Sequence, residues 1–281
     1  MNSLITSIVT AATSFWLHLQ LNIVNLPFHF SAVEIVPHIS YGTEPWQTAD
    51  IYIPHNPDQK KFGVVVFFYG GRWTYGKKED YHFIGNRLAE ENFITVIPDY
   101  QKFPIAHFPS FVEDGAKAVS WVYDNINKYH GDKTHINVMG HSAGGHIGAL
   151  LCADERYLMR QNKTIHGVIH QFVGLAGPYA FTPDEPDLEA IFAPPEQYAQ
   201  MQVPTFIKGN EPPMLLMWGE NDKDVGRFNM ERLQSRIEEK KGVVHSIALP
   251  NIDHIGMLAA FTWLDDKKQP IMKNILDFLR K

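Results

Sequence analysis

Short apolar runs rich in β-branched residues alternate with amphipathic stretches along most of the chain. The run over residues 64–68 is continuously apolar, as expected for a strand buried on both faces of a parallel sheet. The pattern predicts strands over residues 50–53, 63–68, 94–98, 135–139, 168–175, 214–218 and 243–249. It predicts helices over residues 80–91, 111–129, 143–153, 227–240 and 270–280. This alternation indicates an α/β fold with a mostly parallel central sheet and helices on both faces.

Two segments depart from the alternation. Residues 40–54 are predicted to form a pair of strands added to the sheet edge. Residues 177–213 contain eight of the chain's 18 prolines. Because proline lacks a backbone N–H and resists helix interiors, this segment is predicted to be an insertion of loops and short helices. We expect it to form a small cap over the C-terminal strand ends, where ligands bind in open α/β sheets.

The N-terminal segment, residues 4–24, is mostly apolar, and the first Lys or Arg of the chain is Lys60. A secretory signal begins with a basic region, which this segment does not have. Apolar residues recur at helical spacing with polar residues between them, which predicts an amphipathic helix rather than a membrane span. Such a helix would lie across the body of the protein, or contact a membrane surface or a partner. We therefore expect a lead-in over residues 1–37 and one large domain over residues 38–281.

Composition narrows the class of protein. The 281 residues are 44% hydrophobic and 20% charged, which is typical of a globular domain and excludes a disordered or fibrous chain. The net charge of -6 gives no electrostatic basis for binding nucleic acid. The single cysteine, Cys152, cannot form an internal disulfide, and no Cys/His cluster indicates a structural metal. This slightly favours a reducing compartment such as the cytoplasm.

The sequence Gly140-His141-Ser142-Ala143-Gly144-Gly145 joins the strand predicted at 135–139 to the helix predicted at 143–153. It is a G-x-S-x-G motif in the strand–turn–helix context that the motif requires. The glycines permit a strained backbone and close packing of neighbouring chain. Ser142 is therefore the candidate nucleophile. The alternatives, a phosphate-binding glycine loop or an ordinary turn, are disfavoured by this context.

A serine hydroxyl is a weak nucleophile without a base. In this arrangement the acid and then the histidine follow the serine along the chain. Of the 14 histidines, only His245 and His254 follow the strand predicted at 214–218. His245 lies inside the strand predicted at 243–249, whereas His254 lies in the loop after it, where a side chain can reach across the strand ends. His254 is the predicted base.

The acid is expected in the turn after residues 214–218. This turn offers Asp222, with Asp224 as the second choice and Glu220 as the third. Asp222 is preferred because it occupies the middle of the tight turn. It would fix the tautomer of His254 and stabilise the imidazolium that forms during catalysis.

Negative charge on a tetrahedral intermediate needs hydrogen-bond donors. The strand over 63–68 runs into Tyr69-Gly70-Gly71-Arg72-Trp73, at the position of an HGGG-type oxyanion loop. The candidate donors are the backbone N–H groups of Gly71, Arg72 and Gly70, together with that of Ala143. Gly70-Gly71 alone would fit an ordinary turn, but its combination with Ser142 favours an oxyanion hole.

These motifs resemble those of the α/β-hydrolase superfamily, as do Pro98-Asp99-Tyr100, residues 108–114 and Gly177-Pro178-Tyr179. The nearest resemblance is to a compact carboxylesterase branch that includes feruloyl-esterase-like, kynurenine-formamidase-like and isoprenylcysteine-methylesterase-like enzymes. It covers about residues 38–281. It implies a Ser142, Asp222 and His254 triad that hydrolyses small or short-acyl esters through an acyl-enzyme, with no cofactor or metal. An arylformamidase or amidase with the same triad, or a non-catalytic ligand-binding protein, are the alternatives.

The chain departs from this family pattern at two positions. Tyr69 stands where the family usually has a histidine that holds the oxyanion loop, and Arg72 stands at the third glycine, as in an HGGxW variant. The Arg72 side chain would either attract an acidic substrate in the cleft or fold over the surface. Asp114 and Trp121 are expected to support the sheet from its outer face. Five aromatic residues are candidates for an apolar substrate wall or for the core: Trp73, Phe181, Phe192, Tyr198 and Phe206.

Overall fold

The computed structural model describes residues 24–25, 33–56, 61–192, 194–263 and 270–281. In these residues the strands form an 8-stranded sheet in the order β1-β2-β4-β3-β5-β6-β7-β8. The strands are β1 Glu34–Ser40, β2 Thr48–Ile53, β3 Phe62–Phe68, β4 Phe93–Pro98, β5 Gly131–His141, β6 Ile169–Leu175, β7 Met214–Gly219 and β8 Val244–Leu249. β2 is antiparallel to β1 and β4, whereas every other neighbouring pair is parallel. The predicted α/β fold with a mostly parallel sheet is confirmed.

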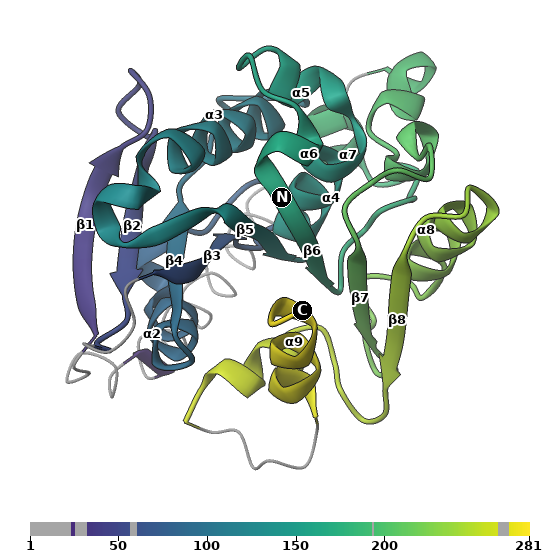
Figure 1. The fold of residues 1–281 in the computed structure, drawn as a ribbon. Helices are drawn as coiled ribbons and strands as arrows, with labels where there is room; N and C mark the ends of the chain where they lie inside the picture. The colour runs from purple at the N-terminus through teal and green to yellow at the C-terminus, as the bar shows by residue number, and fades with distance from the viewer. Residues whose placement is uncertain (1–23, 26–32, 57–60, 193, 264–269) are drawn as a thin grey trace, which may run out of the picture.

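Helices cover both faces of the sheet. They are α2 His82–Glu90, α3 Ser110–Asn125, α4 Ala143–Ala153, α5 Glu155–Met159, α6 Ile165–Val168, α7 Pro186–Phe192, α8 Phe228–Glu239 and α9 Ile271–Leu279. α3 and α4 lie on one face and α2 and α9 on the other (Figure 1). The central strands are therefore buried on both sides: all six residues of β4 are buried, and all but Thr95 are apolar.

The observed elements differ from the predicted ones mainly at their ends and at short segments. The edge pair consists of β1 and β2, but β1 ends at Ser40 rather than starting there, so the sheet begins inside the predicted lead-in. α5 and α6 were not predicted, because helices of five and four residues are too short to show a helical repeat. The proline-rich insertion contains α7 and the 3₁₀ helices Pro195–Gln200 and Val203–Phe206, as expected for a small cap of loops and short helices.

Most of the predicted N-terminal amphipathic helix, residues 4–24, lies outside the described residues. At its end, the buried Asn25 side chain donates a hydrogen bond to the carbonyl of Asp80 and accepts one from the N–H of Phe83, at 2.9 Å each. These contacts fix the chain against the start of α2. Among the described residues, no helix has the length and apolar character needed to cross a membrane.

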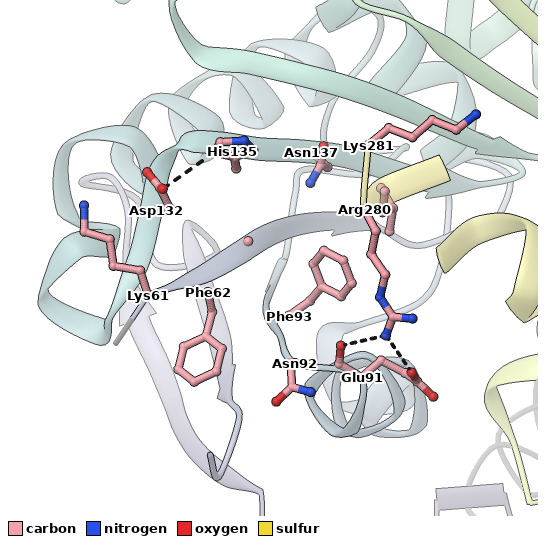
Figure 2. A pocket seen from close by; sticks show the side chains of 12 residues that line it. Lys61, Phe62, Glu91, Asn92, Phe93, Asp132, His135, Asn137, Arg280 and Lys281 are labelled. Carbon is pink, nitrogen blue, oxygen red and sulfur yellow. Dashed lines mark hydrogen bonds and ion pairs between the residues drawn. The ribbon is translucent and has the colours of Figure 1, made fainter. Parts of the chain in front are cut away.

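A cavity of about 390 Å³ lies between the N-terminal ends of β3 and β4 and the end of α9 (Figure 2). Across it, Arg280 Nη2 donates to Glu91 Oε2 at 3.0 Å. Asn137, a buried residue that lines the cavity, donates a hydrogen bond to the carbonyl of Val64 at 3.2 Å. None of the predicted site residues lines this cavity, which lies at the opposite strand ends from Ser142.

Candidate active site

Ser142 occupies a sharp turn between β5 and α4. Its φ of 53° and ψ of -123° are strained for a residue with a Cβ. The Ser142 N–H donates to the carbonyl of Leu175 at the end of β6, at 2.9 Å, which holds the turn at the C-terminal edge of the sheet. Ser142 therefore lies at the strand-end edge where ligands bind in this class of fold.

The glycines on either side of Ser142 are required by close backbone contacts. A Cβ on Gly140 would lie 2.2 Å from the carbonyl oxygen of Gly144. A Cβ on Gly144 would lie 2.0 Å from the carbonyl oxygen of Phe68. Side chains at these positions would push α4 away from the ends of β3 and β5, so the motif's glycines allow the turn to be tight.

Asp222 and His254 form a buried hydrogen-bonded pair. Asp222 follows β7 and His254 lies in the loop after β8, and each is 8% exposed. His254 Nδ1 donates to Asp222 Oδ2 at 2.8 Å, because a carboxylate can only accept. The proton on Nδ1 leaves Nε2 as the basic nitrogen of a neutral His254, which is the tautomer that a general base requires.

The second carboxylate oxygen of Asp222 is fixed by the backbone. Asp222 Oδ1 accepts from the N–H groups of Asp224 and Val225, at 2.9 Å each. Burial by itself raises the pKa of Asp222, but hydrogen bonds from His254 and from these two N–H groups outweigh it and hold the pKa below its ordinary value. Asp222 is therefore a carboxylate oriented on both oxygens.

The other candidates for acid and base are exposed residues. His245 is exposed near the start of β8, with its ring 6.2 Å from that of Phe278. Asp224 and Glu220 are exposed residues of the turn. In the described part of the chain, the carboxylate and imidazole ligand atoms of Asp222, Asp224 and His254 lie within 4.8 Å of one another, a spacing that would suit a metal ion. Asp222 and His254 already bond to each other, so the geometry favours the acid–base pair.

The oxyanion loop has an unusual backbone. Gly71, Arg72 and Trp73 have φ angles of 127°, 49° and 57°. The N–H groups of Thr74 and Tyr75 both donate to the carbonyl of Gly71, at 2.9 and 3.0 Å. A Cβ on Gly71 would lie 2.2 Å from the carbonyl oxygen of Tyr75, so only glycine fits here.

The oxyanion loop and the start of α4 converge on Ser142. A Cβ added to Gly70 would lie 3.0 Å from the Cβ of Ser142. Ala143 is the first residue of α4, so its N–H has no partner in a preceding helical turn. The structure thus places two of the four predicted donor residues, Gly70 and Ala143, next to Ser142.

Tyr69 is held by a stack of aromatic rings and by a carboxylate. Its ring stacks between those of Tyr81 and Tyr100, with centroids 5.1 and 4.7 Å away. Its hydroxyl donates to Asp99 Oδ1 at 2.5 Å, and the Tyr100 hydroxyl donates to the Tyr69 carbonyl at 2.8 Å. Burial raises the pKa of Asp99 despite the Tyr69 hydrogen bond. Tyr69 is therefore anchored where the family usually has histidine.

Arg72 connects the oxyanion loop to the cap. Arg72 Nε donates to Asp187 Oδ2 at 2.7 Å, and Arg72 Nη2 donates to Glu185 Oε2 at 2.6 Å. Two carboxylates already neutralise the guanidinium, so the idea that Arg72 attracts an acidic substrate is not supported. The interaction with a cap more than 100 residues away had no signal in the sequence.

The candidate aromatic wall divides into two groups. Trp73, Phe181 and Phe192 are nearly fully buried and contact one another, with centroids 4.7 to 5.6 Å apart. Tyr198 and Phe206 are only partly buried against the core. The first three therefore form a packed cluster that includes Trp73 of the oxyanion loop.

Asp114 connects α3 to the edge of the sheet. It accepts from Trp46 Nε1 and Gln47 Nε2 in the β1–β2 connection, at 3.1 and 2.7 Å, and from the N–H of Gln101 at 3.0 Å. Trp121, on the same helix, packs against Tyr129. Both residues support the fold from α3, as expected, and neither lies at Ser142.

The order of the strands, the strained serine after β5 and the Asp–His pair after β7 and β8 define an α/β-hydrolase fold. The model of the BD-FAE family matches residues 49–237. The chain belongs to this family, which is consistent with the carboxylesterase-type resemblance of its motifs.

Individual relatives are esterases. The chain is 34% identical over 154 residues to isoprenylcysteine alpha-carbonyl methylesterase ICME of Arabidopsis thaliana, covering 54% of this chain and 36% of that protein. It is 26% identical over 238 residues to esterase LipC of Mycobacterium tuberculosis, covering 77% and 58%. The fold is similar to the crystal structure of esterase B from Lactobacillus rhamnosis, with a TM-score of 0.78, 16% identity and coverage of 98% and 94%. The match thus covers 36% and 58% of the lengths of these two curated relatives, less than two thirds of each.

Proposed function

We propose that this chain is a serine hydrolase of carboxylic esters. The observation that carries the proposal is a strained serine at the end of β5, at the same sheet edge as the buried His254–Asp222 pair. In this pair, His254 Nδ1 donates its proton to the Asp222 carboxylate. Esterase relatives and membership of the BD-FAE family support the same reaction class. Ser142 is the nucleophile, His254 the general base and acid, and Asp222 the residue that orients His254.

The reaction follows from these positions. Nε2 of His254 takes the hydroxyl proton of Ser142 while Oγ attacks the ester carbonyl carbon. The resulting oxyanion accepts hydrogen bonds from backbone N–H groups of the oxyanion loop and from that of Ala143. The C–O bond to the alcohol then breaks, and the alcohol leaves with the proton from His254. His254 then takes a proton from a water molecule as the water oxygen attacks the acyl carbon. The bond from this carbon to Ser142 Oγ breaks, Oγ takes the proton from His254, and the acid is released.

The substrate is proposed to carry a short acyl group. Trp73, at the end of the oxyanion loop, packs against Phe181 and Phe192, and each of the three has less than a tenth of its surface exposed. We take this packed cluster as one wall of the acyl site. We therefore expect turnover to fall with acyl length.

The test is hydrolysis of p-nitrophenyl acetate, butyrate and octanoate by the wild type and by Ser142→Ala. The exposed Ser235 on α8 offers a matched control, Ser235→Ala. We expect Ser142→Ala to lose at least about a thousandfold in kcat/KM and Ser235→Ala to match the wild type. Equal rates in the wild type and Ser142→Ala would overturn the proposal.

The same panel distinguishes the related activities. A formanilide substrate is included, because an arylformamidase would use the same three residues on a C–N bond. Turnover of formanilide in preference to every ester would replace esterase by formamidase as the activity. Absence of turnover of all substrates, and of labelling of Ser142 by a fluorophosphonate, would indicate a non-catalytic binding protein.

A further inference from the structure

His141, the residue before Ser142, makes a buried contact with the loop of the candidate base. His141 Nε2 lies 3.0 Å from the backbone carbonyl oxygen of His254. The two imidazole rings are 4.7 Å apart, and His141 is 2% exposed. A single side chain thus connects the turn that carries Ser142 to the loop that carries His254, across 113 positions of sequence.

The contact fixes the protonation state of His141. A carbonyl oxygen only accepts hydrogen bonds, so Nε2 must carry the proton and donate it. Nδ1 is buried and has no hydrogen-bond partner among the described residues. Burial, with the neighbouring His254 as a second cause and Asp222 opposing it, lowers the pKa of His141 to about 3. His141 is therefore a neutral imidazole with one defined tautomer throughout the pH range in which a histidine base works.

The carbonyl that His141 holds belongs to the base itself. Asp222 holds the ring of His254 from one side through Nδ1, at 2.8 Å. The loop after β8 is otherwise anchored near this point by the N–H of Asn221, which donates to the carbonyl of Ile252 at 2.9 Å. His141 supplies the second anchor, two residues further on, at His254.

His141 also borders the oxyanion loop. A Cβ added to Gly70 would lie 3.0 Å from His141 Nδ1 as well as 3.0 Å from the Cβ of Ser142. The imidazole therefore fills the space at which the turn, the oxyanion loop and the base loop meet.

We infer that His141 is a positioning residue, which holds the backbone of His254 at the distance from Ser142 that proton transfer requires. The inference rests on the proposed function and adds to it a fourth residue that acts only through the base. His141, the residue before the serine in the G-x-S-x-G motif, thereby has a specific role in this chain: it donates one hydrogen bond to the loop after β8.

The experiment compares His141→Phe, which keeps a ring but removes the donor, with His141→Gln, whose amide N–H can reach the same carbonyl. Steady-state kcat and KM are measured with p-nitrophenyl acetate. We expect His141→Phe to lower kcat about 10- to 100-fold with KM nearly unchanged, and His141→Gln to recover most of the loss. His141→Met, flexible and without a donor, replaces the phenylalanine variant if that variant does not fold.

A spectroscopic readout separates positioning from general damage. The proton between His254 Nδ1 and Asp222 gives a downfield ¹H NMR signal that does not depend on turnover. We expect this signal in the wild type and in His141→Gln, and its loss or broadening in His141→Phe.

His146 provides a matched control. It is also fully buried, its Nε2 donates to the carbonyl of Met201 at 2.7 Å, and its Nδ1 is without a partner among the described residues. His146→Phe should lower the thermal stability yet keep the downfield signal. Wild-type kcat and signal in His141→Phe, or equal loss of the signal in His146→Phe, would overturn the positioning role. Retained hydrolysis by Ser142→Ala would instead overturn the proposed function, so the two failures are distinguishable.

Discussion

Arg72 in the oxyanion loop donates two hydrogen bonds to Asp187 at the start of α7, at 2.7 and 3.0 Å. The residue that would present a backbone N–H to an oxyanion is thus connected through its side chain to the cap. If the proposed oxyanion hole includes the Arg72 N–H, we expect this hydrogen-bonded pair to affect its geometry.

Removing the Arg72–Asp187 ion pair should affect activity more than stability. The Arg72 side chain is 38% exposed, and exposed ion pairs contribute only about 0–1 kcal/mol. We expect Arg72→Gln to lower kcat/KM severalfold with a small change in Tm, and Asp187→Asn to do the same without an additive effect in the double variant. Arg236→Gln, which removes an ion pair to Glu239 on α8, is the control. Additive losses from Arg72 and Asp187 would show that the two act independently.

Replacing Asp222 by asparagine should preserve the fold and remove most of the activity. The amide cannot accept from His254 Nδ1 and two backbone N–H groups as the carboxylate does, so the imidazole loses its productive tautomer. We expect a decrease in kcat of about 10³- to 10⁴-fold with p-nitrophenyl acetate. Asp224→Asn, in the same turn, should cost less than about tenfold. A larger loss in Asp224→Asn than in Asp222→Asn would transfer the role of the acid to Asp224.

Tyr69→Phe tests how the oxyanion loop is held. The variant removes the hydroxyl that donates to Asp99, a carboxylate whose pKa burial already raises. We expect a loss of about 1–3 kcal/mol in unfolding free energy and a lower kcat, measured by denaturant unfolding and steady-state kinetics. Tyr157→Phe, another buried tyrosine, should leave kcat unchanged. Wild-type kcat in Tyr69→Phe would mean that ring stacking alone holds the loop.

Stability should fall in mild acid because of His141. Its pKa is lowered from 6.5 to about 3 in the folded protein, so between these values the unfolded chain binds a proton that the folded chain does not. The stability is fully present above pH 6.5 and is lost as the pH falls towards 3. From pH 7 to 5 the His141 contribution should decrease by about 2 kcal/mol.

The lowered pKa of His146 acts in the same direction. The contribution of His141 is therefore measured as the difference between wild type and His141→Gln in unfolding free energy at the two pH values. Identical pH dependence in both proteins would contradict a buried neutral His141.

The sequence by itself determined the α/β class, the positions of most strands and helices, and the glycine-framed turn at Ser142. These features depend on local patterns: apolar runs for buried strands, helical spacing for amphipathic helices, and glycines where a Cβ would collide. Short elements such as α5 and α6, and the true start of the edge strand β1, were missed because their local signal is weak.

Only the tertiary structure decided which charged and polar side chains meet. The turn after β7 offered three acids, and the fold placed Asp222, not Asp224 or Glu220, in hydrogen-bond contact with His254. The Arg72–Asp187 and His141–His254 contacts join residues 115 and 113 positions apart. No local pattern encodes such a pair, because its distance is set by how the strands are ordered in the sheet and how the loops pack across their ends.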